Sequence, residues 1–149
     1  MTGVTAPVLL TVGYEGCTAD EAVAKLQGAQ VTVLVDVRLT PLSRKPGLSK
    51  RRLSERLQQA GIRYLHLPNL GNPRDNRDQF RANDPTAMDR FRDLLHAPHG
   101  AAGVDEIAEL AEDETVALLC FEREWYRCHR QLIADRLSEL HPHLRVRHV

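Results

Sequence analysis

Two of the three cysteines of this chain lie in one short stretch, LLCFEREWYRCHR, which covers residues 118–130. Cys120 ends an apolar run, and Cys128 follows after seven further residues, directly before His129 and Arg130. A cysteine reacts as its thiolate, and a nearby arginine or a helix N-terminus lowers the pKa of its thiol. The stretch therefore contains a candidate nucleophile or redox thiol, Cys120, in a basic environment.

A second group of candidate residues lies in the segment LVDVRLTPLSR, residues 34–44. Asp36 interrupts an apolar run, so we expect it to form an ion pair with an arginine of the same region. Arg38 and Arg44 stand in a proline-containing loop, where they could clamp a phosphate or a carboxylate, because arginine binds such groups through two parallel hydrogen bonds. The alternative is a solvated basic loop.

Five short apolar runs must position these residues. The runs at 8–14 and 31–38 are rich in β-branched residues, and each of the five is expected to be a strand: residues 8–14, 31–38, 62–67, 115–120 and 144–149. The run at 31–38 is nearly continuous, which indicates burial on both faces, as in a parallel sheet.

Helical patterns fill the gaps between these runs. Thr18 and Glu21 form a capping box that begins the first helix, and Gly61 stands where the second should end. Further helices are expected over the ranges 49–61, 105–113 and 128–140. Strands that alternate with helices predict an α/β fold: one domain over residues 1–149, a three-layer α/β/α sandwich with a mainly parallel sheet of about five strands.

In such sheets, ligands bind beyond the carboxyl ends of the strands. The candidate residues follow those ends, so they should share one edge of the sheet. We expect Cys120 to react and three residues to move protons: His66, Glu122 and His129. We expect six residues to bind the substrate, a small anion: Tyr14, Asp36, Arg38, Arg44, Cys128 and Arg130.

Each of these residues has a structural alternative. Both cysteines could be small buried packing residues. His129 shares a helical stripe with Ile133, so it should point toward the sheet, where it could be a hydrogen-bonded core histidine. Arg130 lies in the first turn of a helix, against the helix dipole; it could hold an anion there or pair with Asp36 or Glu122.

Zinc is a further possibility to weigh. The residue types are right, in Cys17, His66, Cys120, Cys128 and His129, but the spacing C-x7-C-H matches no common zinc pattern, so no metal is expected. The cofactor is left open. Three cysteines also argue against a disulfide framework.

The segment 68–87 fits neither strand nor helix pattern well. It contains three prolines, and a loop of this length is usually functional or disordered. It could be a lid over an anionic substrate, or a solvated excursion with a short helix.

Bulk composition limits the classes of function. The chain of 149 residues has 42% hydrophobic and 27% charged residues, as soluble globular domains do. It has no apolar run long enough to span a membrane and no signal-peptide pattern, so a cytoplasmic protein without a membrane partner is expected.

Net charge is zero, but residues 38–56 hold seven basic residues and one acidic residue. A nucleic-acid-binding module is therefore an alternative, as is a domain that binds its ligand without turnover. The oligomeric state is left open.

Two family resemblances complete the sequence-based expectations. VLVDVR on an early strand and a cysteine after a late strand resemble rhodanese, which implies sulfur handling, although FEREWYR after Cys120 has no glycine for a tight loop around the sulfur. TVGYEG, LVDVRLTPLSR, GIRYLHLPNLGN and LLCFEREWYRCHRQLIADRL, in this order, resemble the bacterial family called domain of unknown function 488, from about residue 9 to the end of the last helix. That resemblance implies no particular reaction. It implies the following motif positions: Gly13, Tyr14, Asp36, Arg38, Pro41, Ser43, Arg44, His66, Leu67, Pro68, Leu70, Gly71, Cys120, Glu122, Cys128, His129 and Arg130.

Overall fold

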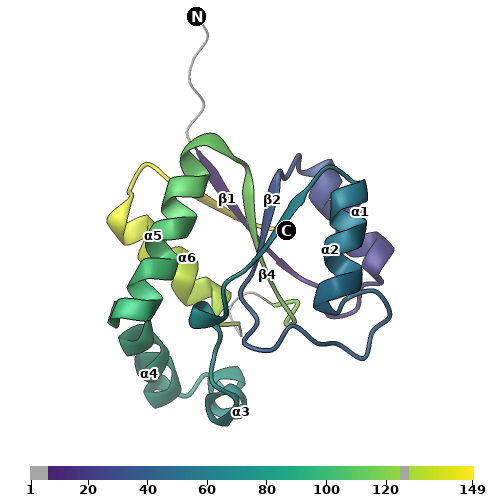
Figure 1. The fold of residues 1–149 in the computed structure, drawn as a ribbon. Helices are drawn as coiled ribbons and strands as arrows, with labels where there is room; N and C mark the ends of the chain where they lie inside the picture. The colour runs from purple at the N-terminus through teal and green to yellow at the C-terminus, as the bar shows by residue number, and fades with distance from the viewer. Residues whose placement is uncertain (1–6, 125–127) are drawn as a thin grey trace, which may run out of the picture.

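The structure is a computed structural model, and it describes residues 7–124 and 128–149. Its five strands are β1 (Val8–Gly13), β2 (Val33–Asp36), β3 (Arg63–His66), β4 (Val116–Cys120) and β5 (Arg145–His148). They form one sheet in the order β3-β2-β4-β1-β5, and every pairing is parallel (Figure 1). The predicted α/β fold with a parallel sheet is confirmed.

Burial along the strands explains this order. All residues of β2 and β4 are buried, as continuous apolar runs in the middle of a parallel sheet should be. The edge strands are more polar: β5 alternates exposed Arg145 and Arg147 with half-buried Val146 and His148. Charged residues on an edge strand oppose pairing with another chain.

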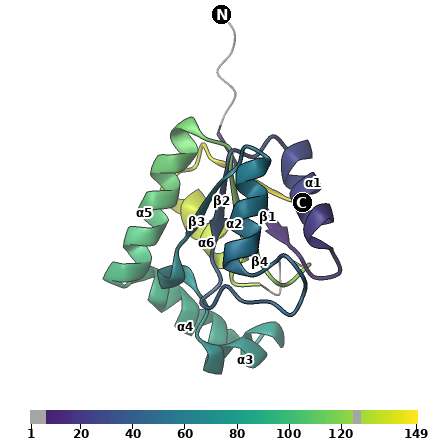
Figure 2. The same ribbon diagram turned by 45° about the vertical axis from the view of Figure 1, so that its right-hand side comes forward.

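Helices cover both faces of the sheet (Figures 1 and 2). One face carries α1 (Ala19–Gly28) and α2 (Lys50–Gln59). The other carries α5 (Pro98–Asp113) and α6 (Arg130–Leu140), with α4 (Pro85–His96) packed against both. The buried residues accordingly divide into two apolar cores, one on each side of the sheet. This is the expected three-layer sandwich.

The sequence patterns correctly predicted the start of α1 and the end of α2. Thr18 and Glu21 form the predicted capping box at the start of α1, each side chain accepting a hydrogen bond from the main chain of the other. Gly61 follows the end of α2 with φ of +77°, a left-handed conformation that glycine adopts without strain. The helix expected over 105–113 is longer than predicted, because it begins at Pro98.

The segment 68–87 differs most from expectation. Instead of a long loop it forms two 3₁₀ turns (Pro68–Leu70 and Arg74–Asn76), the short helix α3 (Arg77–Arg81) and the start of α4. Pro68 and Pro85 occupy first helical positions, where the missing N–H costs no hydrogen bond. These prolines therefore begin helical turns instead of preventing them. The segment also contains a short helix, α3, which one of the two alternatives drawn from the sequence included.

Within the described ranges, no helix has the length and apolar character needed to cross a membrane.

Candidate functional site

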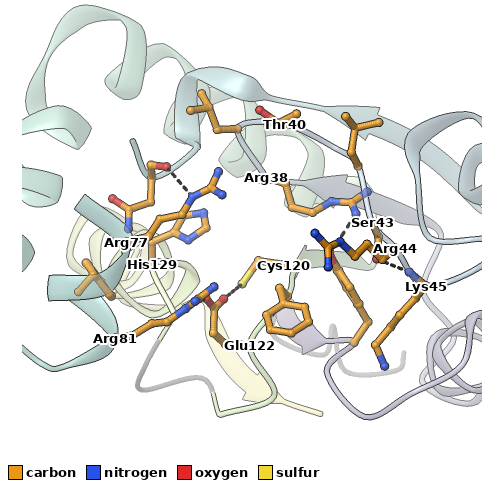
Figure 3. Close-up of a pocket in the computed structure, with 16 residues that line it drawn as sticks. Arg38, Thr40, Ser43, Arg44, Lys45, Arg77, Arg81, Cys120, Glu122 and His129 are labelled. Carbon is orange, nitrogen blue, oxygen red and sulfur yellow. Dashed lines mark hydrogen bonds and ion pairs between the residues drawn. The ribbon is translucent and has the colours of Figure 1, made fainter. Parts of the chain in front are cut away.

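The candidate site lies at the carboxyl edge of the sheet, where the connections of two adjacent strands part. The chain leaves β1 for α1 on one face and leaves β4 for α6 on the other, and β1 and β4 are neighbours. Such a point is where α/β proteins form their ligand crevice. A cavity of about 400 Å³ opens there, lined by residues that follow β1, β2, β3 and β4 (Figure 3).

Cys120 ends β4 and lines this cavity. Its Sγ lies 3.3 Å from Oε2 of Glu122 and 3.3 Å from Nη1 of Arg130. When Cys120 is reduced, this guanidinium group can stabilise its thiolate, and the carboxylate can accept the proton that the thiol loses. The structure therefore brings together three of the residues that the sequence selected.

Cys128 and His129 lie next to Cys120 and immediately precede α6. Both side chains are buried. The structure joins the sulfurs of Cys120 and Cys128 as a disulfide, a pairing that the small number of cysteines did not indicate. Cys17 is free and half-buried, and it is not one of the residues that line the cavity.

His129 points toward the sheet, as its helical stripe predicted. Its Nε2 lies 2.9 Å from the carbonyl oxygen of Val37, so Nε2 carries the proton and Nδ1 keeps a lone pair. Nδ1 lies 3.7 Å from Sγ of Cys128. Burial lowers the pKa of His129, and the charge of Arg130 acts in the same direction, so the imidazole is neutral at neutral pH.

Arg130 is fully buried in the first turn of α6. Its Nη1 donates to the carbonyl oxygen of Glu122, and its Nη2 donates to that of Arg123 at 3.1 Å. Burial lowers the pKa of Arg130 to about 10, while the charge of Glu122 opposes that shift, and the side chain stays cationic at neutral pH. Arg130 thus fixes the loop after β4 through main-chain carbonyls and brings a positive charge to Cys120.

Asp36 and Arg38 form the ion pair that the sequence predicted. Arg38 donates from Nε to Oδ1 at 2.8 Å and from Nη2 to Oδ2 at 2.7 Å, and both side chains are buried. Burial alone would lower the pKa of Arg38, but the hydrogen bonds and charge of Asp36 outweigh it and raise the pKa. Nη1 donates to the carbonyl oxygen of Leu48 at 2.7 Å and to the hydroxyl of Tyr14 at 3.3 Å. Arg38 therefore lines the cavity, but most of its N–H groups already donate hydrogen bonds to other protein groups.

Cations line the cavity on two sides. Figure 3 shows Cys120 between basic residues of α3 and basic residues of the loop after β2: Arg77 and Arg81 on α3, and Arg38, Arg44 and Lys45 on the loop. Of the described residues that line the cavity, Glu122 alone is acidic, and it pairs with Arg81 at 2.9 Å. The lining therefore has a net positive charge.

Arg77 and Arg81 were missing from the predicted binding set. The signal that could have found them is their spacing of four residues, which places two arginines on one face of a helix. Arg77 donates from Nε toward the carbonyl oxygen of Asn72 at 3.5 Å, and Arg44 is exposed without an ion pair to any described residue. These two guanidinium groups have the most freedom to bind an incoming anion.

His66 is not brought to the cavity with the others. Its side chain is half-buried, its Nε2 lies 2.8 Å from the carbonyl oxygen of Arg38, and it is absent from the cavity lining. This contact holds the main chain where the loop after β2 begins.

Comparison with known proteins places the chain in a family. No curated protein and no solved structure matches it. The model of one protein family, described as domain of unknown function DUF488, matches residues 18–137 of the 149. This range runs from the start of α1 into α6 and includes every residue that lines the cavity except Tyr14, and it confirms the resemblance seen in the sequence motifs. The chain belongs to the DUF488 family.

Proposed function

We propose that the cavity binds a small phosphate- or carboxylate-bearing molecule and that Cys120 is the reaction centre of the site. The observation that carries this proposal is the position of Cys120 in a cavity lined by five cationic side chains and one carboxylate. A volume of about 400 Å³ suits a small molecule, since ligand pockets span roughly 300–1,000 Å³.

The cations would have different roles. Arg44 and Arg77 would contact the anion directly, because neither is held in an ion pair with a described residue. Arg38 would position the loop after β2 and add its charge, since Asp36 and Leu48 already take most of its donors. A guanidinium group binds phosphate or carboxylate through two parallel hydrogen bonds, which makes these arginines better suited to such ligands than lysines would be.

The chemistry would begin in the reduced protein, after a thiol reductant has cleaved the disulfide between Cys120 and Cys128, with ionisation of the Cys120 thiol. Arg130 favours the thiolate across 3.3 Å, and Glu122 can take the proton across the same distance. Arg81 holds Glu122 in place through a 2.9 Å ion pair. The resulting thiolate would face a ligand whose negative charge is balanced by the arginines, so Cys120 would act as the nucleophile or as a ligand for an electrophile.

The contacts of the basic stretch 38–56 do not favour the nucleic-acid alternative. Arg38 is buried against Asp36, and Arg51 pairs with Glu55 at 3.4 Å. Arg56 pairs with Asp20 on α1. Three of the seven basic residues of this stretch are thus paired with carboxylates in the folded protein.

The proposal is tested by anion binding in variants of the two uncommitted arginines. Isothermal titration with inorganic phosphate, a nucleoside monophosphate and a dicarboxylate would be measured on the reduced wild-type protein and on Arg44→Gln and Arg77→Gln. We expect at least one anion to bind, and each variant to bind it about tenfold or more weakly, because a charged hydrogen bond contributes roughly 1.5–3 kcal/mol.

Arg92→Gln is the matched control. Arg92 lies on α4, is about half exposed, and pairs with Asp89 outside the cavity lining, so its loss should leave anion binding unchanged. Absence of binding by all three anion classes, or equal losses in Arg92→Gln and Arg77→Gln, would contradict the proposed site.

A further inference from the structure

Three buried groups that can bind a metal converge at the base of the cavity. Sγ of Cys120, Sγ of Cys128 and Nδ1 of His129 all lie within 4.8 Å of one another. In a tetrahedral zinc site, with Zn–S near 2.3 Å and Zn–N near 2.0–2.1 Å, donor atoms are roughly 3.5–3.8 Å apart. The distance of 3.7 Å between Sγ of Cys128 and Nδ1 of His129 agrees with that arrangement.

His129 is oriented as a metal ligand. Nε2 donates to the carbonyl oxygen of Val37, which fixes the tautomer that leaves the lone pair of Nδ1 toward the two sulfurs. Histidine ligands almost always donate their second ring N–H to a carbonyl or carboxylate in this way.

The main chain around the two cysteines also fits a shared ligand. Their Cα atoms are 7.4 Å apart, whereas most disulfides join Cα atoms about 4.4–6.8 Å apart. Two thiolates bound to one metal ion can be further apart than two sulfurs bonded to each other. The spacing of the strand end and the helix start therefore suits a metal between the sulfurs.

The surroundings of the two sulfurs suit thiolate ligands. Two thiolates would neutralise the charge of Zn²⁺, and the guanidinium group of Arg130 lies 3.3 Å from Sγ of Cys120. Arg130 donates from Nη1 to Sγ of Cys120 at 3.3 Å and from its main-chain N–H to Sγ of Cys128 at 3.5 Å. Hydrogen bonds of this kind stabilise thiolate ligands.

We propose that Cys120, Cys128 and His129 bind one Zn²⁺ ion at the base of the cavity. Three protein ligands leave a fourth position open, as in catalytic zinc sites. Cys120 and His129 both line the cavity, so the open position faces the space that the arginines surround. The identity of the molecule in that space rests on the proposed function: it would be the phosphate or carboxylate ligand, or a water molecule beside that ligand. Cys120 is then a thiolate ligand, and the zinc ion is the electrophile.

The test is metal binding by the whole chain after reduction and removal of metal with a chelator. Zn²⁺ would be titrated in competition with a chromophoric chelator, and Co²⁺ would be added to report its ligands by thiolate-to-cobalt charge-transfer absorption. We expect one ion per chain, and absorption typical of tetrahedral cobalt with two thiolates. Cys128→Ser and His129→Gln should each weaken binding at least a hundredfold.

Cys17→Ser is the matched control, because Cys17 is the remaining cysteine and lies outside the cluster. Circular dichroism of each variant shows whether it folds. If a variant does not, zinc X-ray absorption of the wild-type protein decides the question: two sulfurs and one nitrogen support the inference. Absence of stoichiometric metal, an all-nitrogen and oxygen shell, or oxidation of Cys120 and Cys128 to a disulfide despite equimolar Zn²⁺ would overturn it.

The outcomes separate this inference from the proposed function. Arg77→Gln should weaken the anion and leave zinc affinity unchanged, since Arg77 is not among the three ligands. If zinc does not bind but anions still do, the metal inference alone falls. If zinc binds and no anion does, the proposed function falls and a metal site remains.

Discussion

Replacing Asp36 by asparagine should be among the most destabilising single changes in this protein. The carboxylate is fully buried and accepts hydrogen bonds from Nε and Nη2 of Arg38, from the main-chain N–H of Arg38 and from the hydroxyl of Tyr64. Asparagine keeps the shape but turns one acceptor into a donor, so an N–H group meets other donors. It also leaves the guanidinium group of Arg38 buried without a counter-charge.

The magnitude follows from the buried pair. Removing one partner of such a pair costs roughly 3–5 kcal/mol, because the remaining charge stays desolvated. For 149 residues the entropy of unfolding is about 0.3 kcal/mol per degree, so the melting temperature should fall by about 10–16 °C. Urea unfolding followed by circular dichroism measures the free energy, and a thermal scan measures the temperature.

A double-mutant cycle identifies the cause. Arg38→Met removes the other partner, and the double variant should lose about 2–3 kcal/mol less than the two single losses added together. Asp89→Asn is the control: the Asp89 side chain is 72% exposed, so its pair with Arg92 should contribute less than about 1 kcal/mol. If Asp36→Asn unfolds within about 1 kcal/mol of wild type, the pair is not desolvated and the reasoning is wrong.

Two further predictions concern the same edge of the sheet. Gly13→Ala should destabilise the fold and weaken anion binding, because its Cβ would meet the carbonyl of Glu122. Gly28→Ala, in the last turn of α1, meets nothing within 4 Å and should leave anion binding unchanged and raise stability by at most about 1 kcal/mol; urea unfolding and titration calorimetry measure the two effects. Burial and the hydrogen bond to Asp36 raise the pKa of Tyr64, so above the unfolded value of about 10 the unfolded chain releases a proton that the folded chain keeps, and stability falls as pH rises. Tyr64→Phe should reduce that fall between about pH 10 and 12, and an unchanged slope in urea unfolding would argue against this role for the hydroxyl.

The fold was predictable because its strands are unusual in one respect. β4 is a continuous apolar run and β2 is one up to its last residue, Asp36, and such runs leave few alternatives to a parallel sheet between two helical layers. The strand order was not predictable from these patterns, because β4 enters between β1 and β2, and a choice among neighbours depends on packing over the whole sheet.

The site was predictable in position more than in detail. Cys120 and Arg130 meet because a strand end and the next helix start share an edge, which topology alone dictates. The same argument failed for His66, whose ring turns to a main-chain carbonyl instead of the cavity. Arg77 and Arg81 contribute through the five-residue helix α3, which is too short to give a clear helical pattern in a segment whose composition resembles a loop.

The position of β4 between β1 and β2 affects when the chain can fold during its synthesis. β1 and β2 are completed early in synthesis, yet neither pairs with the other, and their shared neighbour begins only at Val116. Until that strand is synthesised, two apolar strands stay without a central partner, and an incomplete chain has open edges that are prone to association. A ribosome-bound chain truncated before Val116 should therefore remain unfolded, because β1 and β2 then lack the strand that joins them.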